Sequence, residues 1–521
     1  MKIKQLLSTL SLREKIYQTI ILHDDTIYDP ETTKNKMKTE CVGGYFVGEE
    51  IIGGNAMKGN DIIEAVKRIK KYSKIPPIIC ADTEFGCGYM FPDGRYSDFP
   101  WLMTLGATDN TKYAYDFGKY TAIPAKEIGI NLSLGPVADL NMNFLNPVVN
   151  TRSISDNPQV AKRLLSSMVK GMQDYGMGAT AKHFPGDGVD YRDQHYVLTS
   201  NTLSLEEWRN SFGAVYKELI DQGLLCVMAG HLSLPSYQKQ RIDGIAPPAT
   251  LSKELITDLL KGELGFSYAV VSDALCMNAF RTTYCDQIKS ELECFKAGVD
   301  LMLWPSKEFP DALEKAILNS EIPMSRLDDA VERIFKLKEA LGLFDNRKFK
   351  TDDISGVMEM DRKIAESAVT LVRDRKGQLP FKNVKKVALI TITDYDDEFA
   401  SLHHMVDEFA LHGVEATLYK KDCDDDISNF DLIVYTTFCH EHKPCGMLQI
   451  IPTWQTGALS KEKTVVVALG SPYLINTNFP TVNMAVAVYS DTEQCMKASA
   501  RAILGKIPFV GKLPVKMQEI F

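Results

Sequence analysis

The 521-residue sequence lacks any apolar run that approaches the length of a membrane-spanning helix. Its N-terminus also lacks the sustained apolar segment and the cleavage site of a secretory signal, and it is expected to begin a helix. Positive charge is not in excess, because 59 lysines and arginines stand against 68 aspartates and glutamates, a net charge of −9. We therefore expect neither a membrane nor a nucleic acid as a partner, since both are usually bound through basic surfaces.

The eleven cysteines lack the regular spacing of a disulfide framework. Several of them, such as Cys80, Cys226 and Cys276, lie in apolar runs where a reduced and buried thiol is expected, which predicts a cytoplasmic location. Residues 439–445 contain metal-ligand residue types, but their spacing matches no zinc pattern and predicts an ordinary loop. No metal ion and no cofactor is expected.

The length predicts two or three domains with ordinary globular composition, since 45% of the residues are hydrophobic and 24% are charged. Short apolar strands alternate with helices up to about residue 345, and the polar, poorly periodic residues that follow predict a linker. We expect a first domain over residues 1–345, a linker over 346–360 and a second domain over 361–521. The sequence has no low-complexity tract and no fixed-period repeat beyond this alternation.

The first domain is predicted to contain about seven short strands. They cover residues 42–47, 77–81, 131–140, 178–183, 224–229, 269–272 and 299–303. Their apolar residues do not alternate with polar ones, which indicates strands buried on both faces of a parallel sheet. Repeated βα units over about 340 residues fit a (β/α)8-type TIM barrel better than an open doubly wound sheet, which is the alternative. Residues 5–22 are predicted to form an N-terminal helix, with Ser11 and Glu14 as a capping box.

The second domain is predicted to be a smaller three-layer α/β domain, or α/β sandwich. A helix is expected to begin at Asp361 and to run into a strand near Arg373. Further strands are predicted at residues 386–391, 416–419, 431–436, 464–469 and 484–489, and a last helix at 492–504.

Polar side chains occur at or just after the C-terminal ends of several predicted strands. They are Asp82, Asp139, Lys182, His183, His231 and Asp273. Polar residues often end strands because the chain leaves the core there, and this explains any one of them. In a barrel, however, these ends form a single mouth where distant parts of the sequence converge. The set as a whole therefore favours a shared pocket.

Asp273 and the pair Asp193 and His195 carry residue types that support catalysis. A carboxylate fixed at a strand end acts as a nucleophile or stabilises charge, although a lone aspartate more often caps a turn. A histidine exchanges protons near neutral pH and a nearby carboxylate orients it, although D-x-H is also the pattern of a solvated loop pair. Lys182 is a candidate for binding hydroxyl groups or for an ion pair, and His183 for a buried structural imidazole.

Residues 182–195 read Lys182-His183-Phe184-Pro185-Gly186-Asp187-Gly188 and then, in register, Asp193-Gln194-His195. This segment resembles the signature of glycoside hydrolase family 3, and more narrowly its β-N-acetylglucosaminidase branch, KHFPGHGxxxxDSH. Other stretches are similar to further motifs of the family, in the same order. They are Leu12–Ile16, Asp82-Thr83-Glu84-Phe85-Gly86, Gly135–Asp139, Asn146-Pro147, Thr151-Arg152-Ser153, Ala229-Gly230-His231, Leu264–Met277 and Gly511–Pro514.

The resemblance implies a retaining β-glycosidase in which Asp273 is the nucleophile and His195, supported by Asp193, is the acid/base. It implies that Asp82, Arg152, Lys182 and His183 hold the sugar, with His231 and Met277 nearby. The leading hypothesis is a β-N-acetylglucosaminidase that acts on peptidoglycan- or chitin-derived fragments, as a monomer or homodimer. The alternatives are a phosphorylase, a β-glucosidase or xylosidase of the same fold, and a catalytically silent sugar-binding protein.

The sequence departs from the family signature within the catalytic loop itself. Asp187 stands where the family usually has histidine, which adds a negative charge to the loop, and Gln194 replaces serine. Val189 and Asp190 replace the usual Asp-Thr. Both proposed catalytic positions are intact, so these changes bear on the substrate more than on the type of reaction.

Overall fold

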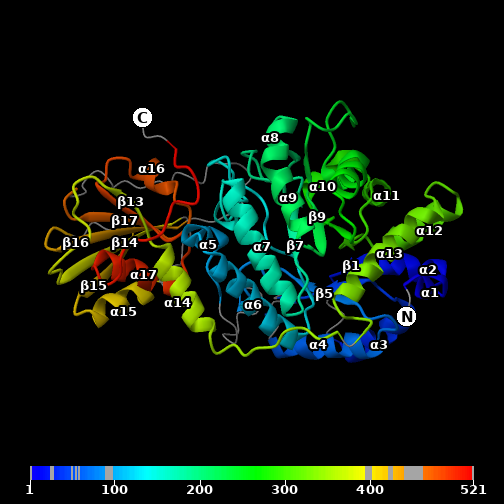
Figure 1. Cartoon of the computed structure of the whole chain (residues 1–521), viewed down its shortest axis with the longest axis horizontal. Coiled ribbons are helices and arrows are strands. Elements are labelled where there is room, and N and C mark those ends of the chain that lie inside the picture. The colour runs from blue at the N-terminus through cyan, green and yellow to red at the C-terminus, as the bar shows by residue number, and fades with distance from the viewer. Residues whose placement is uncertain are drawn as a thin grey trace.

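The computed structural model describes residues 3–23, 29–48, 51–52, 55–56, 59–88, 98–345, 347–393, 402–420, 426–438 and 461–518. The chain forms two α/β units that lie side by side, a larger unit at the right of Figure 1 and a smaller one, coloured yellow to red, at its left. None of the described helices combines the length and apolarity that crossing a membrane requires.

The larger unit is built on a ring of parallel strands. These are β1 (Ile20–Leu22), β2 (Gly44–Phe46), β5 (Ile78–Ala81), β6 (Leu132–Ser133), β7 (Thr180–Phe184), β9 (Cys226–Ala229), β11 (Val270–Ser272) and β12 (Met302–Leu303). They pair in the orders β12-β1-β2-β5-β6 and β11-β9-β7. Parallel bridges from Leu132 to Gly178 and from Val271 to Leu301 join the two groups at both ends, so the ring is closed. The closed ring confirms the predicted TIM barrel and excludes the open sheet.

Helices surround the ring. They are α1 (Ile3–Ser8), α2 (Leu12–Gln18), α3 (Pro30–Thr39), α4 (Gly59–Tyr72), α5 (Leu102–Thr108), α6 (Thr111–Ile128), α7 (Pro158–Asp174), α8 (Leu205–Asn210), α9 (Phe212–Asp221), a π-helix (Glu254–Glu263), α10 (Asn278–Tyr284), α11 (Gln287–Ala297), α12 (Phe309–Leu318) and α13 (Met324–Ala340). Short additions are the 3₁₀ turns Asn150–Arg152 and Ala249–Leu251 and the pairs β3 (Ile51–Ile52) with β4 (Asn55–Ala56) and β8 (Thr199–Ser200) with β10 (Leu232–Ser233).

The prediction of one helix over residues 5–22 is wrong in its middle, where the segment divides into α1 and α2, and at its C-terminal end. The capping box of Ser11 and Glu14 does begin α2, but this helix ends at Gln18 and the chain continues as β1. Ile20 and Ile21 continue the apolar spacing of the helix, so the pattern alone cannot separate them from it. Their strand conformation comes from pairing with β2 and β12 on either side, which are distant in sequence.

Asn157 caps the helix α7. Its side chain accepts the hydrogen bond from the backbone N–H of Gln159. The preceding residue, Asp156, accepts a hydrogen bond from the backbone N–H of Lys516, 2.7 Å away. Asp156 therefore connects the barrel to the C-terminal segment.

The smaller unit is a six-stranded sheet between helices. Its strands are β13 (Thr370–Asp374), β14 (Lys386–Thr393), β15 (Glu415–Lys420), β16 (Leu432–Phe438), β17 (Thr464–Ala468) and β18 (Met484–Ala487), in the order β13-β18-β17-β16-β14-β15. All pairs are parallel except β13 with β18. Its helices are α14 (Val357–Ala368), α15 (His403–Leu411), α16 (Leu474–Asn478) and α17 (Glu493–Ile503). This is the predicted three-layer arrangement.

Each face of this sheet has its own apolar core. Along β14, Val387 and Leu389 belong to one cluster and Ala388 and Ile390 to the other, as the twofold repeat of a strand requires. The first cluster packs against α15 and α17, and the second includes Met103 and other residues of α5 and α16. Because α5 belongs to the barrel unit, one core is shared between the two units.

Candidate active site

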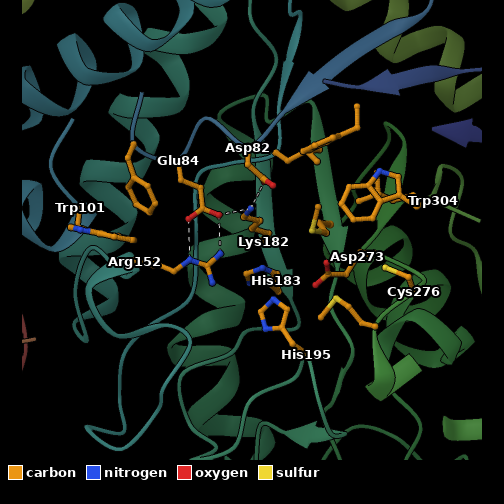
Figure 2. Close-up of a pocket in the computed structure, with 17 residues that line it drawn as sticks. Asp82, Glu84, Trp101, Arg152, Lys182, His183, His195, Asp273, Cys276 and Trp304 are labelled. Carbon is orange, nitrogen blue, oxygen red and sulfur yellow. Dashed lines mark hydrogen bonds and ion pairs between the residues drawn. The ribbon is translucent and has the colours of Figure 1, made fainter. Parts of the chain in front are cut away.

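A cavity of about 290 Å³ opens where the barrel strands end, and it collects most of the residues predicted for the site. Asp82, Arg152, Lys182, His183, His195, Asp273 and Met277 all line it. Figure 2 shows the charged cluster of Asp82, Glu84, Arg152 and Lys182 on one side and His195 and Asp273 across from it. The convergence of strand ends that the sequence predicted is therefore present in the structure.

Glu84 is the centre of the charged cluster, although it was not among the predicted site residues. Arg152 donates two hydrogen bonds to its carboxylate, from Nε at 3.0 Å and Nη2 at 2.8 Å, and the Lys182 ammonium forms a further short ion pair with it. Lys182 also donates to Asp82 at 2.9 Å. Burial opposes the ionisation of Glu84, but Arg152 and Lys182 outweigh it and lower the pKa of Glu84 well below its ordinary range. The cluster is thus a fixed array of charges that suits hydroxyl recognition.

His183 is held from behind by Asp139. Its Nδ1 lies 2.7 Å from Oδ2 of Asp139, and its backbone N–H donates to Oδ1 of the same carboxylate at 3.0 Å. A carboxylate partner fixes the proton on Nδ1, which leaves Nε2 as the atom that can meet a ligand. The strand predicted over residues 131–140 is shorter in the structure, because β6 ends at Ser133 and Asp139 lies in the segment that follows it. Asp139 orients His183 from there.

Asp187, the residue that departs from the family signature, belongs to the loop after β7, and its side chain is buried. Its Oδ1 accepts hydrogen bonds from the backbone of Gly188 at 2.6 Å and from Asn146 at 3.0 Å, while the buried Oδ2 has no hydrogen-bond partner. Burial, and then the nearby charge of Asp139, raise the pKa of Asp187 to about 7. A protonated Asp187 removes much of the negative charge that the sequence suggested for this loop.

Asp193 and His195 form the predicted pair on the loop after β7. The Nδ1 of His195 lies 2.6 Å from Oδ1 of Asp193, which also accepts the backbone N–H of His195 at 2.8 Å. Burial opposes charge on His195, but the hydrogen bond and the negative charges of Asp193 and Asp273 outweigh it and raise the pKa of His195. The imidazole thus carries its transferable proton on Nε2, toward the pocket.

Asp273 lies directly after β11. Its Oδ1 accepts the backbone N–H of Ala274 at 2.8 Å, and the residue is only 9% exposed. Burial opposes its ionisation, but the neighbouring histidines, His183 foremost, outweigh it and hold the pKa of Asp273 below its ordinary value. Asp273 is therefore an anion at neutral pH, which a nucleophile requires.

His231 does not line the described cavity wall, unlike the other predicted sugar-binding residues. It is fully buried, with Nδ1 3.0 Å from the hydroxyl of Thr250 and Nε2 3.0 Å from the carbonyl oxygen of Ala274. Burial lowers the pKa of His231 and favours its neutral form. The structure places it behind the residue that follows Asp273, so it acts on the site through the backbone of Ala274.

Aromatic residues that the sequence did not reveal form two opposite walls. Trp304 stacks on His23 with ring centroids 4.9 Å apart and meets Phe46 edge-on at 5.2 Å. Phe85 and Trp101 pack on each other at 4.0 Å on the other side (Figure 2). Such residues are as common in cores as in pockets, so nothing in the sequence distinguished them. They give the pocket flat apolar surfaces of the kind on which sugar rings stack.

Within the described ranges, no group of three or more His, Cys, Asp or Glu residues is arranged to hold a metal ion. Residues 439–445, with their metal-ligand residue types, lie outside the described residues.

The fold and the pocket together define a class of protein. A TIM barrel carries its reactive groups at the strand ends, and here they are an anionic carboxylate, a carboxylate-oriented histidine and a charged cluster for hydroxyl groups. This is the constitution of a glycoside-cleaving enzyme. The model of the glycosyl hydrolase family 3 N-terminal domain matches residues 11–337, and the chain belongs to that family.

Relatives and solved structures agree with this assignment. The chain is 28% identical over 510 residues to a beta-N-acetylglucosaminidase/beta-glucosidase of Cellulomonas fimi, which covers 91% of this chain and 90% of the relative. It is 36% identical over 211 residues to a beta-hexosaminidase of Stenotrophomonas maltophilia, covering 39% of this chain and 60% of the relative. Its structure resembles that of the beta-glucoside phosphorylase BglX bound to 2FGlc, with a TM-score of 0.85, 26% identity and coverage of 99% and 96%.

Proposed function

We propose that the protein is a retaining β-N-acetylglucosaminidase that removes terminal β-linked N-acetylglucosamine through a covalent intermediate on Asp273. The observation that carries the proposal is the His195–Asp193 pair, which faces the same pocket as the anionic Asp273. One group can attack the anomeric carbon while the other supplies the proton. This division of roles is what retention of configuration requires.

In the first step, a carboxylate oxygen of Asp273 forms a bond to the anomeric carbon as the glycosidic bond breaks. The leaving oxygen takes the proton from Nε2 of His195. The raised pKa of His195 keeps that proton available near neutral pH. Asp193 stabilises the imidazolium before the transfer and keeps the ring oriented after it.

In the second step, neutral His195 removes a proton from water, which attacks the anomeric carbon and releases Asp273. The charge of Asp273 contributes to the raised pKa of His195, and this contribution is lost while Asp273 is esterified. The pKa of His195 therefore falls when the histidine must act as a base after having acted as an acid.

The choice of an amino sugar rests on relatives. Curated relatives named beta-N-acetylglucosaminidase/beta-glucosidase and beta-hexosaminidase A match over more than nine-tenths of this chain. We propose peptidoglycan- or chitin-derived fragments as the source of the glycoside. A reducing cytoplasm is proposed as the location, which the eight free cysteines of the described chain support.

A second candidate is a phosphorylase that uses phosphate in place of water. The close structural similarity to the beta-glucoside phosphorylase BglX favours it. A neutral histidine base does not repel an anionic acceptor as a carboxylate base does, so the pocket is physically compatible with phosphate.

Turnover of aryl glycosides, with and without an N-acetyl group, tests the proposal in buffers with and without phosphate. We expect free N-acetylglucosamine as the product in both buffers. Asp273→Asn should lower the rate by at least about 10³-fold, because the nucleophile is lost. Formation of sugar 1-phosphate would favour the phosphorylase, preference for the sugar without the N-acetyl group would favour a β-glucosidase, and unchanged turnover by Asp273→Asn would exclude the nucleophile.

A further inference from the structure

A second cavity, of about 370 Å³, lies at the junction of the two units and is lined mainly by acidic and polar side chains. Asp98 reaches it from the segment before α5, Asp361 from α14 and His404 from α15. Asp491 and Glu493 reach it from the start of α17. Helix α14 packs against both α17 and α5 of the barrel unit, and α15 packs against α17 (Figure 1). The residues that line this cavity differ from those that line the active-site cavity.

Asp361 is the feature of this cavity that needs an explanation. It lines the cavity, yet it is only 5% exposed, and its Oδ1 is buried without a hydrogen-bond partner. A buried carboxylate oxygen without a partner is costly, because it has lost water and gained nothing in exchange. Burial, then the charges of Glu493 and Asp98, raise the pKa of Asp361 to about 7. Asp361 therefore lies among other acidic residues, and a positive charge bound in this cavity would stabilise its ionised form.

The cavity contains more acidic residues than the N-terminus of helix α17 can explain. Asp491 and Glu493 lie at the N-terminus of α17, where negative charge is favourable, and Glu493 also forms an ion pair with Lys497 at 2.5 Å. Asp361 lies in the interior of α14, and Asp98 lies on another segment, so this explanation does not cover them. Among the lining residues that the structure describes, His404 is the one basic side chain.

The spacing of the acids decides which kind of cation fits. No three acid, histidine or cysteine side chains of the described chain converge closely enough to coordinate a metal ion. The carboxylates are instead distributed around a cavity that also presents the exposed side chain of Met358, while Met496 lies buried in its wall. Methionine side chains are flexible apolar surfaces that suit methylene groups. An elongated organic cation matches both properties.

We propose that this cavity binds an aliphatic di- or polyamine, with one ammonium group donating to the buried carboxylate of Asp361 and another to the acids at its mouth. The ligand supplies the positive charge that the carboxylate of Asp361 lacks, and its methylene chain packs on the exposed side chain of Met358. Bound at the junction, it stabilises the arrangement of the two units.

The proposal makes binding dependent on pH. An ammonium group favours the ionised form of Asp361, so binding releases the proton that Asp361 retains near neutral pH. His404, Asp98, Asp491 and Glu493 are the other titratable groups that face the cavity. Protonation of the carboxylates or of His404 weakens the binding of a cation, so affinity should be higher at pH 8 than at pH 6.

Isothermal titration of the full chain with spermidine, at constant ionic strength, tests the site directly and does not depend on glycosidase activity. We expect saturable binding to the wild type and a loss of affinity of about tenfold or more in Asp361→Asn, which keeps the shape but removes the charge. Glu359→Gln is the matched control, because it removes a half-exposed carboxylate of α14 that does not line the cavity. Its affinity should equal that of the wild type.

Three outcomes would overturn the proposal. They are the absence of saturable binding, equal affinity of the wild type and Asp361→Asn, and complete competition by MgCl₂ at the same ionic strength, which would indicate general screening of charge. If Asp361→Asn does not fold, Asp98→Asn takes its place, because Asp98 is an exposed member of the same cavity. An unchanged affinity in Asp98→Asn would then count against the site.

Discussion

Each proposed catalytic or sugar-binding group of the pocket has a neighbour that sets its protonation state. Asp193 raises the pKa of His195, Asp139 fixes the proton of His183, and the histidines keep Asp273 ionised. The neighbours are almost completely buried, whereas the side chain of His195 is 38% exposed. Buried carboxylates therefore set the protonation of the histidines, while the ring of His195 remains accessible from the pocket.

Replacement of Asp193 by Asn should change the pH dependence of the reaction. His195 must be protonated to act as an acid, so kcat/KM for a poor leaving group falls as the pH rises through the pKa of His195. Asp193→Asn removes the group that raises this pKa, and the alkaline limb should move to lower pH. The measurement is a pH profile of kcat/KM. An activated leaving group needs no acid and serves as the control, and an alkaline limb at the wild-type position would contradict the role of Asp193.

Glu84→Gln should affect both stability and substrate binding. The side chains of Glu84, Arg152 and Lys182 are only 4–8% exposed, so loss of the shared carboxylate removes a buried negative charge that two buried cations share. Lys182 then keeps its ion pair with Asp82. We expect a loss of about 3–5 kcal/mol in the free energy of unfolding and a higher KM. Denaturant unfolding and steady-state kinetics measure the two effects.

A surface pair provides the control for this experiment. Glu64 pairs with Lys67, and both side chains are at least 60% exposed, so Glu64→Gln should cost less than about 1 kcal/mol. Equal losses in the two variants would show that the buried cluster does not depend on Glu84.

At the residue scale, the sequence reveals chemistry that is local in the chain. Asp82, Lys182 and Asp273 could be predicted to converge, because each lies at a strand end of a barrel. Glu84 lies within the motif Asp82–Gly86. The two cations that define its role come from distant segments, so the sequence did not reveal that role. His231 was expected near the sugar-binding residues, and the structure places it behind Ala274, which lines the cavity. Its position at a strand end is real, but its ring points to Thr250 and the backbone, which only the packing of the chain decides.

The loop after β7 is the element on which the site depends most. Its glycines at 186 and 188 have φ angles of 117° and 107°, which other residues rarely adopt. Gln194, which replaces the usual serine, accepts the backbone N–H of His231 at 3.0 Å and connects the loop to the end of β9. The loop is therefore held between β7, which it follows in the chain, and the end of β9, to which Gln194 binds.

Gly188→Ala should disrupt this loop. A Cβ atom at position 188 would lie 2.0 Å from the backbone carbonyl oxygen of Leu140, which cannot move easily. Gly223 is the matched control, since it also has a positive φ, 87°, but no atom lies within 4 Å of its Cβ position. We expect Gly188→Ala to lose about 2 kcal/mol more stability than Gly223→Ala, and to lose at least about tenfold in kcat. Equal effects on stability, or unchanged turnover, would show that the approach to Leu140 is unimportant.

At the element scale, strands and helices were predictable where the apolar residues follow a single repeat along the sequence. The parallel strands of the second unit follow the predicted ranges closely, because most of them, such as β16 and β17, are nearly continuous apolar runs between turns. β1 was not predictable, because its three residues continue the apolar spacing of α2 and become a strand only through neighbours at residues 44–45 and 302–303.

At the scale of the whole molecule, the second unit supports the barrel from the side of the catalytic mouth. The amide of Asn141, on the segment between β6 and Arg152, donates to the hydroxyl of Tyr473 at 3.0 Å. Ser155, shortly after Arg152, donates to the carbonyl oxygen of Pro514 at 2.6 Å. The segment that presents Arg152 is thus anchored to two separate parts of the C-terminal half.

Tyr473→Phe should weaken this connection. It removes the acceptor of a buried amide group, and we expect a loss of about 1–3 kcal/mol in the free energy of unfolding, together with a higher KM through Arg152. Tyr216→Phe is the control, because the hydroxyl of Tyr216 is buried without a hydrogen-bond partner and its loss should change stability by less than about 0.5 kcal/mol. Urea unfolding of both variants is the measurement, and the reverse order of the two losses would refute the connection.

The pairing of Asp193 with His195 has one further consequence for turnover. Because the carboxylate binds both the backbone and the ring of a residue only two positions away, the proton donor and the group that tunes it form one small rigid body. A displacement of the loop carries this body as a whole, so it changes the distance from the proton to the leaving oxygen without changing the internal acidity that Asp193 provides. The hydrogen bonds that attach the loop therefore set the distance over which His195 would deliver its proton, while Asp273 is placed separately, directly after β11.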